Sequence, residues 1–175
     1  NVKTITIGNA VSQFEVPADL AAEKPHHTIV FIGRLVRKHK RPHLLIEAFK
    51  KIADKYPGWQ VELWGSEGGK QYYKHLEQMI SKFDLKDRVF LKGATTDVPS
   101  VLKNGDIFAF PSAYEGFGLA LAEAMSMGLP AIGYKNCVAV NELIVNNENG
   151  FLCEDGVDDF SEKLKMLMSS NELRV

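Results

Sequence analysis

From His27 onward, the sequence alternates short apolar runs with longer segments whose apolar residues recur every three or four positions. Short apolar runs are typical of strands buried in a parallel sheet, and the longer pattern is typical of helices packed on one side. Repeated alternation of the two predicts an α/β fold, with a parallel sheet of about six strands covered by helices on both faces. The expected strands are 28–32, 60–64, 89–91, 107–110, 131–134 and 151–153.

The expected helices fill the gaps between these strands. Pro42 begins the first of them, because proline is well tolerated in a first turn, and Leu45 and Phe49 follow on one face. The expected helices are 42–55, 70–83, 99–103, one that starts at 118 or 119, 140–145 and 158–168.

The loops after the expected strands should share one rim, because the carboxyl ends of parallel strands lie at the same edge of a sheet. Ligands of such sheets bind at this edge. One residue from each of five loops should therefore lie on the rim: Arg34, Gly65, Gly93, Glu115 and Gly133.

The segment from Glu115 to Glu123 reads EGFGLALAE and places two carboxylates around a glycine loop and the helix that follows it. If the helix begins at Gly118 or Leu119, Glu123 lies little more than one turn inside it, so both carboxylates can reach one ligand. A helix N-terminus has free N–H groups and about half a positive charge, which suits an anion. A nucleotide sugar fits, because it has a phosphate for the helix end and hydroxyl groups on either side.

Composition limits the class of protein. The chain has 175 residues, 45% hydrophobic and 25% charged, which is enough for one ordinary core and too little for two large domains. Its formal net charge of −1 provides no basic field for nucleic acid, and no run approaches the roughly 18 apolar residues of a membrane span. Cys137 and Cys153 lack metal-site or disulfide spacing, so we expect two free buried thiols and a reducing compartment.

Two blocks of the sequence resemble the signature of the retaining glycosyltransferases of the glycogen-synthase-like, or group 1, superfamily. One is the segment 115–123, preceded by Phe-Pro-Ser at 110–112 and followed by Ala-Met-Ser-Met-Gly-Leu-Pro at 124–130. The other is Gly-Arg-Leu at 33–35, then Lys40, then Leu-Leu-Ile-Glu-Ala-Phe at 44–49. The resemblance runs from about His27 to Met168, and the two blocks in the right order are far more specific than either alone.

The resemblance implies two Rossmann-like halves, of which this chain contains the half that binds the donor. Residues 27–175 are then the nucleotide-sugar domain, and residues 1–26 are a linker between domains, with a short strand at 2–7. The N-terminal acceptor domain is absent from the chain. The first residue is Asn1 rather than Met, so we expect a fragment that binds donor weakly and transfers hardly any sugar.

The basic element of this family holds the donor diphosphate with an Arg and a Lys, which match Arg34 and Lys40. Sugar transfer leaves growing negative charge on the phosphates, so fixed cations stabilise the transition state more than the ground state. Lys40 is matched by counting back from the helix that follows, and Lys38 is the alternative. Taken alone, the basic residues Arg37, Lys38, Lys40 and Arg41 would be interpreted as a solvated loop. The presence of the segment 115–123 favours the phosphate site instead.

The two carboxylates also take their roles from the resemblance. Glu115 matches the carboxylate that contacts donor-sugar hydroxyls near the reacting carbon, where positive charge develops. Glu123 matches the one that accepts hydrogen bonds from both ribose hydroxyls, and the alternative is an ordinary surface position on the helix. Arg34, Lys40 and Glu115 are thus the expected catalytic residues. The other expected donor-binding residues are Gly33, Gly65, Thr95, Gly116, Phe117, Gly118, Leu119, Ala120 and Glu123.

Some donor contacts should come from the backbone. The N–H groups of 117–120 face the sugar and the distal phosphate, and Thr95 lies in the loop where relatives seat the base. Relatives commonly have a Gly-Gly pair where this chain has Lys-Asn-Cys at 135–137, which leaves the fine donor contacts open. We expect no metal or other cofactor, because the five His residues are scattered and relatives use protein cations instead.

The resemblance implies retaining transfer of a hexosyl group from a nucleoside-diphosphate sugar to a glycan or lipid-linked acceptor. UDP-sugar is favoured over GDP-sugar on family frequency alone. Two alternatives stay open: a nucleotide-sugar epimerase of the same architecture, which the paired glutamates disfavour, and a noncatalytic nucleotide-sugar-binding module. We expect a cytoplasmic location, with peripheral association of the full-length protein at the inner face of the membrane as the alternative.

Overall fold

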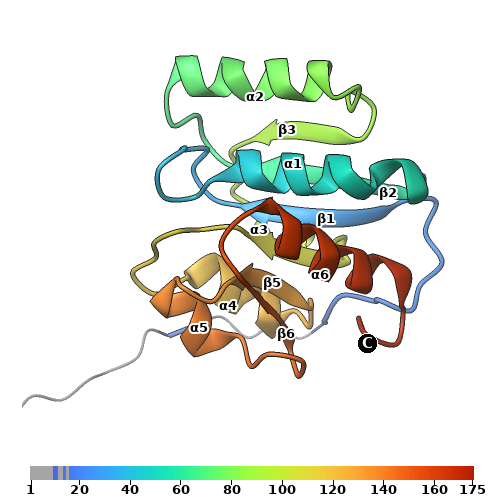
Figure 1. Ribbon diagram of the computed structural model, residues 1–175. Helices are drawn as coiled ribbons and strands as arrows, with labels where there is room; N and C mark the ends of the chain where they lie inside the picture. The colour runs from blue at the N-terminus through green and yellow to red at the C-terminus, as the bar shows by residue number, and fades with distance from the viewer. Residues whose placement is uncertain (1–9, 12–13, 15) are drawn as a thin grey trace, which may run out of the picture.

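The computed structural model describes residues 10, 11, 14 and 16–175, so the strand expected at 2–7 lies outside the described residues. Six strands form one parallel sheet (Figure 1). They are β1 (His27–Ile32), β2 (Trp59–Trp64), β3 (Val89–Gly93), β4 (Ile107–Phe110), β5 (Ala131–Tyr134) and β6 (Gly150–Cys153). Their order across the sheet is β3-β2-β1-β4-β5-β6.

The direction of winding reverses between β1 and β4, which lie side by side in the sheet. Ile29 of β1 pairs with Val61 of β2 on one side and with Ile107 of β4 on the other. In sheets of this kind, the loops after the two central strands diverge and leave a crevice at their carboxyl ends. Here these are loops 33–41 and 111–118, at the left-hand edge of Figure 1.

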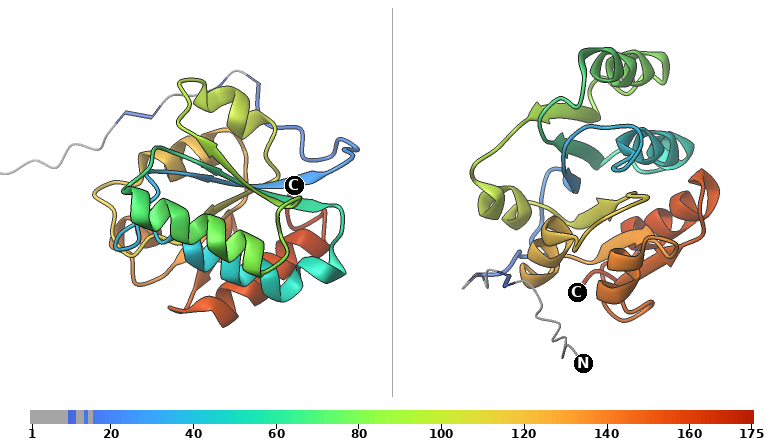
Figure 2. Two further views of the ribbon diagram at one scale, coloured as in Figure 1. Left: turned by 90° about the horizontal axis from the view of Figure 1, so that it is seen from above. Right: turned by 90° about the vertical axis from the view of Figure 1, so that its left-hand side faces the viewer.

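Helices cover both faces of the sheet, as Figure 2 shows. They are α1 (Pro42–Ile52), α2 (Lys70–Lys82), α3 (Val98–Lys103), α4 (Leu119–Ser126), α5 (Val138–Leu143) and α6 (Val157–Ser169). Helices α1, α2 and α6 share one hydrophobic core, and α3, α4 and α5 share the other. The predicted α/β fold with a Rossmann-like parallel sheet is confirmed.

Alternate residues of the central strands fill two separate cores, because successive side chains of a strand point to opposite faces. Ile29 and Phe31 of β1 pack with α1, α2 and α6, whereas Val30 packs with the helices of the other face. All three side chains are fully buried. Burial of each contributes about 2 kcal/mol, so β1 binds the two helical layers to one sheet.

Two helices differ from the prediction by more than one residue at an end, and three others differ by a single residue at one or both ends. The helix expected at 42–55 stops at Ile52 and continues as a short 3₁₀ turn, η1 (Ala53–Lys55). The helix expected at 140–145 begins earlier, at Val138, and ends at Leu143. Val138 is exposed although it begins the helix, and Ile144 is buried although it follows the helix. The apolar residues from which the helix is predicted are therefore shifted toward the C-terminus relative to the helix.

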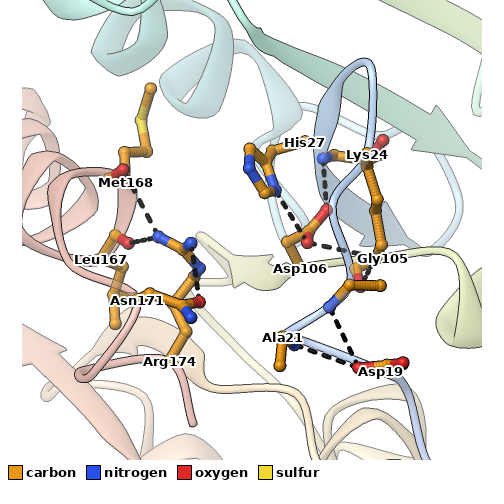
Figure 3. Close-up of polar contacts among 12 residues, drawn as sticks. Asp19, Ala21, Lys24, His27, Gly105, Asp106, Leu167, Met168, Asn171 and Arg174 are labelled. Carbon is orange, nitrogen blue, oxygen red and sulfur yellow. Dashed lines mark hydrogen bonds and ion pairs between the residues drawn. The ribbon is translucent and has the colours of Figure 1, made fainter.

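A buried carboxylate joins the amino ends of β1 and β4 (Figure 3). Asp106, in the loop before β4, is fully buried. Its Oδ1 accepts a hydrogen bond from Lys24 Nζ at 3.1 Å and lies 3.0 Å from His27 Nδ1. Its Oδ2 accepts from the Thr28 N–H at 2.7 Å. Asp106 therefore attaches the segment before β1 to the sheet.

The C-terminal segment reaches the same edge of the sheet. The guanidinium of Arg174 lies 5.1 Å from the centroid of the Trp59 ring, and its Nη1 donates to the Leu167 carbonyl at 2.7 Å. The His27 ring stacks on the same indole, with 4.8 Å between ring centroids. Trp59 thus contacts both the first residue of β1 and the C-terminal segment.

Candidate functional site

The carboxyl ends of β1, β2 and β3 meet through glycine backbones. The Gly33 N–H donates to the Trp64 carbonyl at 2.9 Å. The Gly65 N–H donates to the Gly93 carbonyl at 2.7 Å. Gly65 has a φ of 153°, and a Cβ there would lie 2.0 Å from the carbonyl oxygen of Gly33. Only glycine therefore fits at position 65 without displacing the loop after β1.

Lys40 and Glu115 meet across the two central loops. Lys40 Nζ lies 2.6 Å from Glu115 Oε1 and 4.8 Å from the centroid of the Phe110 ring. The two side chains are only 22% and 9% exposed, so the ion pair is largely shielded from water. A backbone hydrogen bond, from the Ala113 N–H to the His39 carbonyl at 2.7 Å, joins the same two loops. The fold therefore brings together two of the predicted catalytic residues from distant parts of the sequence.

Arg34, the third predicted catalytic residue, lies on the same loop as Lys40. Its side chain is exposed and, within the described part of the chain, has no hydrogen-bond or ion-pair partner. The neighbouring Leu35 is fully buried, and its N–H donates to the Ser66 carbonyl at 2.9 Å. The backbone that carries Arg34 is thus fixed, whereas the guanidinium is available to a ligand. Lys38, the alternative to Lys40, is exposed and does not contact Glu115.

The loop after β4 leads into α4, which begins at Leu119, one of the two starts predicted from sequence. Gly118 precedes it with a φ of 83°, a left-handed conformation that favours glycine. No side chain caps this helix, so its first N–H groups are unpaired within it. Four other predicted donor-binding residues on this loop and helix are exposed or half-buried: Gly116, Phe117, Leu119 and Ala120.

Four helices that begin at the carboxyl edge carry no negative charge in their own first turns. Helices α1, α2, α4 and α5, which follow the four inner strands, have neither a side-chain cap nor an acidic residue in the first turn. By contrast, Asp97 caps α3, and α6 has Asp158 and Asp159 in its first turn. Because each N-terminus carries about half a positive charge, the inner part of the edge suits an anion such as a diphosphate.

Glu123 lies in the second turn of α4, where Leu121 and Ala124 are buried beside it. Its side chain is half-buried and, among the residues that the structure describes, makes no hydrogen bond or ion pair. Both carboxylate oxygens can therefore accept hydrogen bonds from a ligand. The ribose-binding role of Glu123 stays a prediction.

Thr95 lines a hollow of about 340 Å³ at the carboxyl ends of β2 and β3. Trp64 and Lys92 line it as well, with Lys92 Nζ 5.2 Å from the centroid of the indole ring and 3.4 Å from Glu62 Oε1. The Thr95 hydroxyl accepts a hydrogen bond from the Asp97 N–H at 3.0 Å, which fixes the turn after β3. The hollow adjoins the strand end that supports the loop after β1. The base-binding role of the Thr95 loop stays a prediction.

A family model described as glycosyl transferases group 1 matches residues 12–175, which is nearly the whole chain. The chain belongs to the group 1 glycosyltransferases. This finding confirms the family that the two sequence blocks indicate.

The relatives of this chain are longer than the chain itself. An uncharacterized glycosyltransferase of Haemophilus influenzae is 30% identical over 159 residues, which are 90% of this chain and 44% of that protein. The poly(ribitol-phosphate) alpha-N-acetylglucosaminyltransferase of Staphylococcus aureus is 30% identical over 169 residues, 96% of this chain and 33% of that protein. A crystal structure of a mutant TarM of S. aureus, in complex with fondaparinux, alpha-GlcNAc-glycerol and UDP, has a TM-score of 0.85 at 28% identity. That match covers 97% of this chain and 33% of the TarM chain, so the chain spans less than half the length of each of these proteins.

A half-buried polar pair joins α1 to α2 behind the loop after β1. His43 Nδ1 lies 2.7 Å from the Tyr72 hydroxyl. Burial, with the charges of Arg37, His75 and Arg41, lowers the pKa of His43 to about 4. Burial also raises the pKa of Tyr72 to about 12. Both groups are therefore neutral at pH 7, and His43 adds no positive charge beside the loop.

The two cysteines of the glycosyltransferase are free and buried, as the sequence predicts. Burial raises the pKa of both thiols, and the charge of Glu115 further raises the pKa of Cys137. Both thiols therefore stay protonated at neutral pH, which makes them poor nucleophiles and poor metal ligands.

The described part of the glycosyltransferase contains no group of three or more His, Cys, Asp or Glu side chains placed to hold a metal ion. None of its described helices has both the length and the apolar content that crossing a membrane requires. Another hollow, of about 360 Å³, lies at the amino edge and is lined by none of the predicted site residues.

Arg41 is the residue of the candidate site that sequence reasoning misses. From sequence, it is one basic residue in a loop of several. In the structure it precedes α1 with a φ of 49°, and its side chain is only 15% exposed. No sequence pattern indicates this position, because its hydrogen-bond partners, Pro111 and Asp155, lie 70 and 114 residues away along the chain.

Proposed function

We propose that this chain binds the donor of a retaining hexosyl transfer, with a UDP-sugar as the favoured donor. The observation that carries the proposal is the Lys40–Glu115 pair at the carboxyl ends of β1 and β4, beside the uncapped N-terminus of α4. A cation, a carboxylate and an anion-binding helix end suit a ligand whose phosphates adjoin hydroxyl groups. The UDP named in the TarM complex supports the choice of base.

In this proposal, Arg34 and Lys40 hold the diphosphate. Cleavage of the bond between sugar and phosphate leaves negative charge on the phosphate oxygens. Charge-assisted hydrogen bonds from the guanidinium and the ammonium strengthen as that charge grows, and the N–H groups at the start of α4 act in the same sense. Glu115, next to Lys40, accepts hydrogen bonds from the sugar hydroxyls and favours the positive charge that develops on the reacting carbon.

The nucleoside lies on the opposite side of the phosphates from the sugar in this arrangement. Glu123 accepts hydrogen bonds from both ribose hydroxyls through its two oxygens. The base lies in the loop of Thr95, beside the indole of Trp64. The proposal uses no metal or other cofactor, because Arg34, Lys40 and the helix ends supply the positive charge.

The proposal assigns the acceptor to a second domain. Residues 27–175 act as the donor-binding domain and residues 1–26 as the linker to an N-terminal domain, in keeping with the greater length of the relatives. That domain would supply the site for a glycan or lipid-linked acceptor, as the polymer in the name of the S. aureus relative suggests. We place the protein in the cytoplasm, with the full-length form at the inner face of the membrane as the alternative, and expect this chain alone to transfer hardly any sugar.

Calorimetric titration with UDP, GDP and ADP in the presence of a metal chelator tests the proposal. We expect UDP to bind most tightly. A hydrogen bond to a charged group is worth about 1.5 to 3 kcal/mol, so the double substitution Arg34→Ala, Lys40→Ala should weaken UDP binding by about tenfold or more. Glu123→Ala should weaken it as well, whereas Lys55→Ala, at an exposed position in the 3₁₀ turn after α1, should not.

Three outcomes would count against the proposal in different ways. UDP affinity that ignores all these substitutions would reject the residue assignments. Failure of the full-length protein to bind any of the three nucleotides would reject donor binding itself. Release of a rearranged nucleotide sugar without an acceptor would favour an epimerase over a transferase.

A further inference from the structure

Arg41 has a backbone conformation that arginine rarely adopts. Its φ and ψ are 49° and 42°, in the left-handed region, directly after Lys40 and before the first residue of α1. The other described non-glycine residues with positive φ are Asp84 and Asn147, types that tolerate this region better. Since glycine would fit here without strain, interactions of the arginine side chain are the natural reason for its presence.

The side chain of Arg41 contacts the ends of three other strands. Its Nε donates to the Pro111 carbonyl, just after β4, at 3.0 Å. Its Nη1 lies 2.9 Å from the carboxylate of Asp155, after β6. The guanidinium lies 4.6 Å from the ring centroid of Tyr134, the last residue of β5. The Tyr134 hydroxyl donates to the Gly156 carbonyl at 2.7 Å, so this ring is itself fixed.

We propose that Arg41 is the positioning residue that holds Lys40 against Glu115. Arg41 is adjacent to Lys40 in the chain, and its contact at Pro111 lies at the root of the loop that carries Glu115. The guanidinium therefore fixes both loops of the ion pair, and the stack on Tyr134 fixes the guanidinium in turn. Arg41 does not touch the pair itself, so it acts through the placement of Lys40.

A purely stabilising role is the competing explanation, and Arg88 provides a matched control for it. Arg88 donates to two backbone carbonyls, those of Tyr56 and Trp59, whereas Arg41 donates to one carbonyl and one carboxylate. The guanidinium of Arg88 likewise lies over an aromatic ring, 5.4 Å from the centroid of Phe49. It is located at the amino edge of the sheet, away from Lys40. Loss of Arg88 should therefore lower stability in the same manner without altering the ion pair.

The reactivity of Lys40 toward dilute acetic anhydride, measured for each lysine by peptide mass spectrometry, reads the ion pair directly and needs no ligand. The decisive variant is Arg41→Gly, because glycine keeps the left-handed backbone and removes only the side chain. Releasing an ion pair worth up to about 1 kcal/mol should make Lys40 about three- to fivefold more reactive in this variant. Asp155→Asn, which removes one anchor of the guanidinium, should give a smaller increase. Arg88→Ala should leave Lys40 unchanged.

A rate of Lys40 acetylation in Arg41→Gly equal to that of the wild type would overturn the proposal. An equal increase in Arg88→Ala would overturn it too, since general loosening of the fold would then explain both. The inference rests on the proposed function only in assuming that the Lys40–Glu115 pair matters for donor binding. Failure of the wild-type chain to bind UDP would count against donor binding and leave the acetylation result intact.

Discussion

Gly65 lies so close to Gly33 that a Cβ on Gly65 would be 2.0 Å from the Gly33 carbonyl oxygen. The contact joins the ends of β1 and β2 directly beneath the loop of Arg34 and Lys40. Because backbone rather than a flexible side chain is the obstacle, the loop itself must move if a side chain is added.

Substitution Gly65→Ala should therefore destabilise the protein. The clash and the positive φ together should lower the free energy of unfolding by about 2 to 4 kcal/mol. Urea unfolding monitored by circular dichroism measures this. Gly116→Ala is the control, because nothing lies within 4 Å of a Cβ there, and its effect should stay below about 0.5 kcal/mol. Equal midpoints for the two variants would show that the loop after β1 yields easily.

Glu115→Gln should strengthen the binding of UDP and weaken the contribution that the sugar makes to the binding of a UDP-sugar. The neutral amide no longer competes with phosphate for Lys40, so UDP should bind more tightly, by up to about 1 kcal/mol. The additional affinity that the sugar gives a UDP-sugar over UDP should fall, because a carboxylate acceptor is lost. Titrations of UDP and UDP-glucose into wild type, Glu115→Gln and the exposed control Glu148→Gln measure both effects. Weaker UDP binding in Glu115→Gln would contradict the idea of competition for Lys40.

The pH dependence of stability should contain a contribution from His43. Its pKa falls from 6.5 to about 4 in the folded state, so the unfolded chain binds the proton more readily. The stabilising effect is complete above pH 6.5 and is lost as the pH falls toward 4, by about 2 kcal/mol after allowance for partial exposure. His43→Asn, which does not titrate, should flatten the curve of unfolding free energy in this range relative to the exposed control His26→Asn. Parallel curves for the two variants would exclude the contribution.

Asp106→Asn should be among the most destabilising single-atom changes in the described fold. The substitution keeps the shape and removes the charge that faces Lys24 and His27, so a partly buried ammonium loses its partner. We expect the free energy of unfolding to fall by about 2 to 3 kcal/mol. Asp54→Asn, whose ion pair with Lys50 is exposed, should change it by less than about 0.5 kcal/mol. Similar losses in both variants would mean that the buried pair contributes no more than a surface one.

The sheet could be predicted because its strands carry a strong signal. Ile107–Phe110 and Ala131–Tyr134 are buried throughout, and both have the bounds predicted from sequence. Where burial is uneven, the ends of a strand differ from the predicted ends. Strand β1 begins at His27, one residue before the predicted strand. The partners of His27, which are Trp59 and Asp106, come from elsewhere in the chain. Polar residues that are fixed by tertiary contacts give no local signal of strand structure.

The candidate site could be predicted in part from the topology of the sheet. In a parallel sheet the loops after strands share one edge, which is sufficient to place Lys40 near Glu115. Topology alone does not distinguish Lys40 from Lys38, although the family resemblance favours Lys40. The support that Arg41 gives to the contact could not be predicted. This support depends on a left-handed residue at position 41 and on carbonyl and aromatic partners from three other strands.

The ion pair between Lys40 and Glu115 also has a consequence for selectivity. Each charge already has an intramolecular partner, so an incoming anion competes with a tethered carboxylate of high effective concentration. Inorganic phosphate or a simple monoanion could take the ammonium only by leaving the shielded carboxylate without a cation. A molecule that presents phosphates and hydroxyl groups together gives both members of the pair a new partner at once. Under the proposed function, the contact therefore favours ligands that carry both phosphates and hydroxyl groups over small anions such as inorganic phosphate.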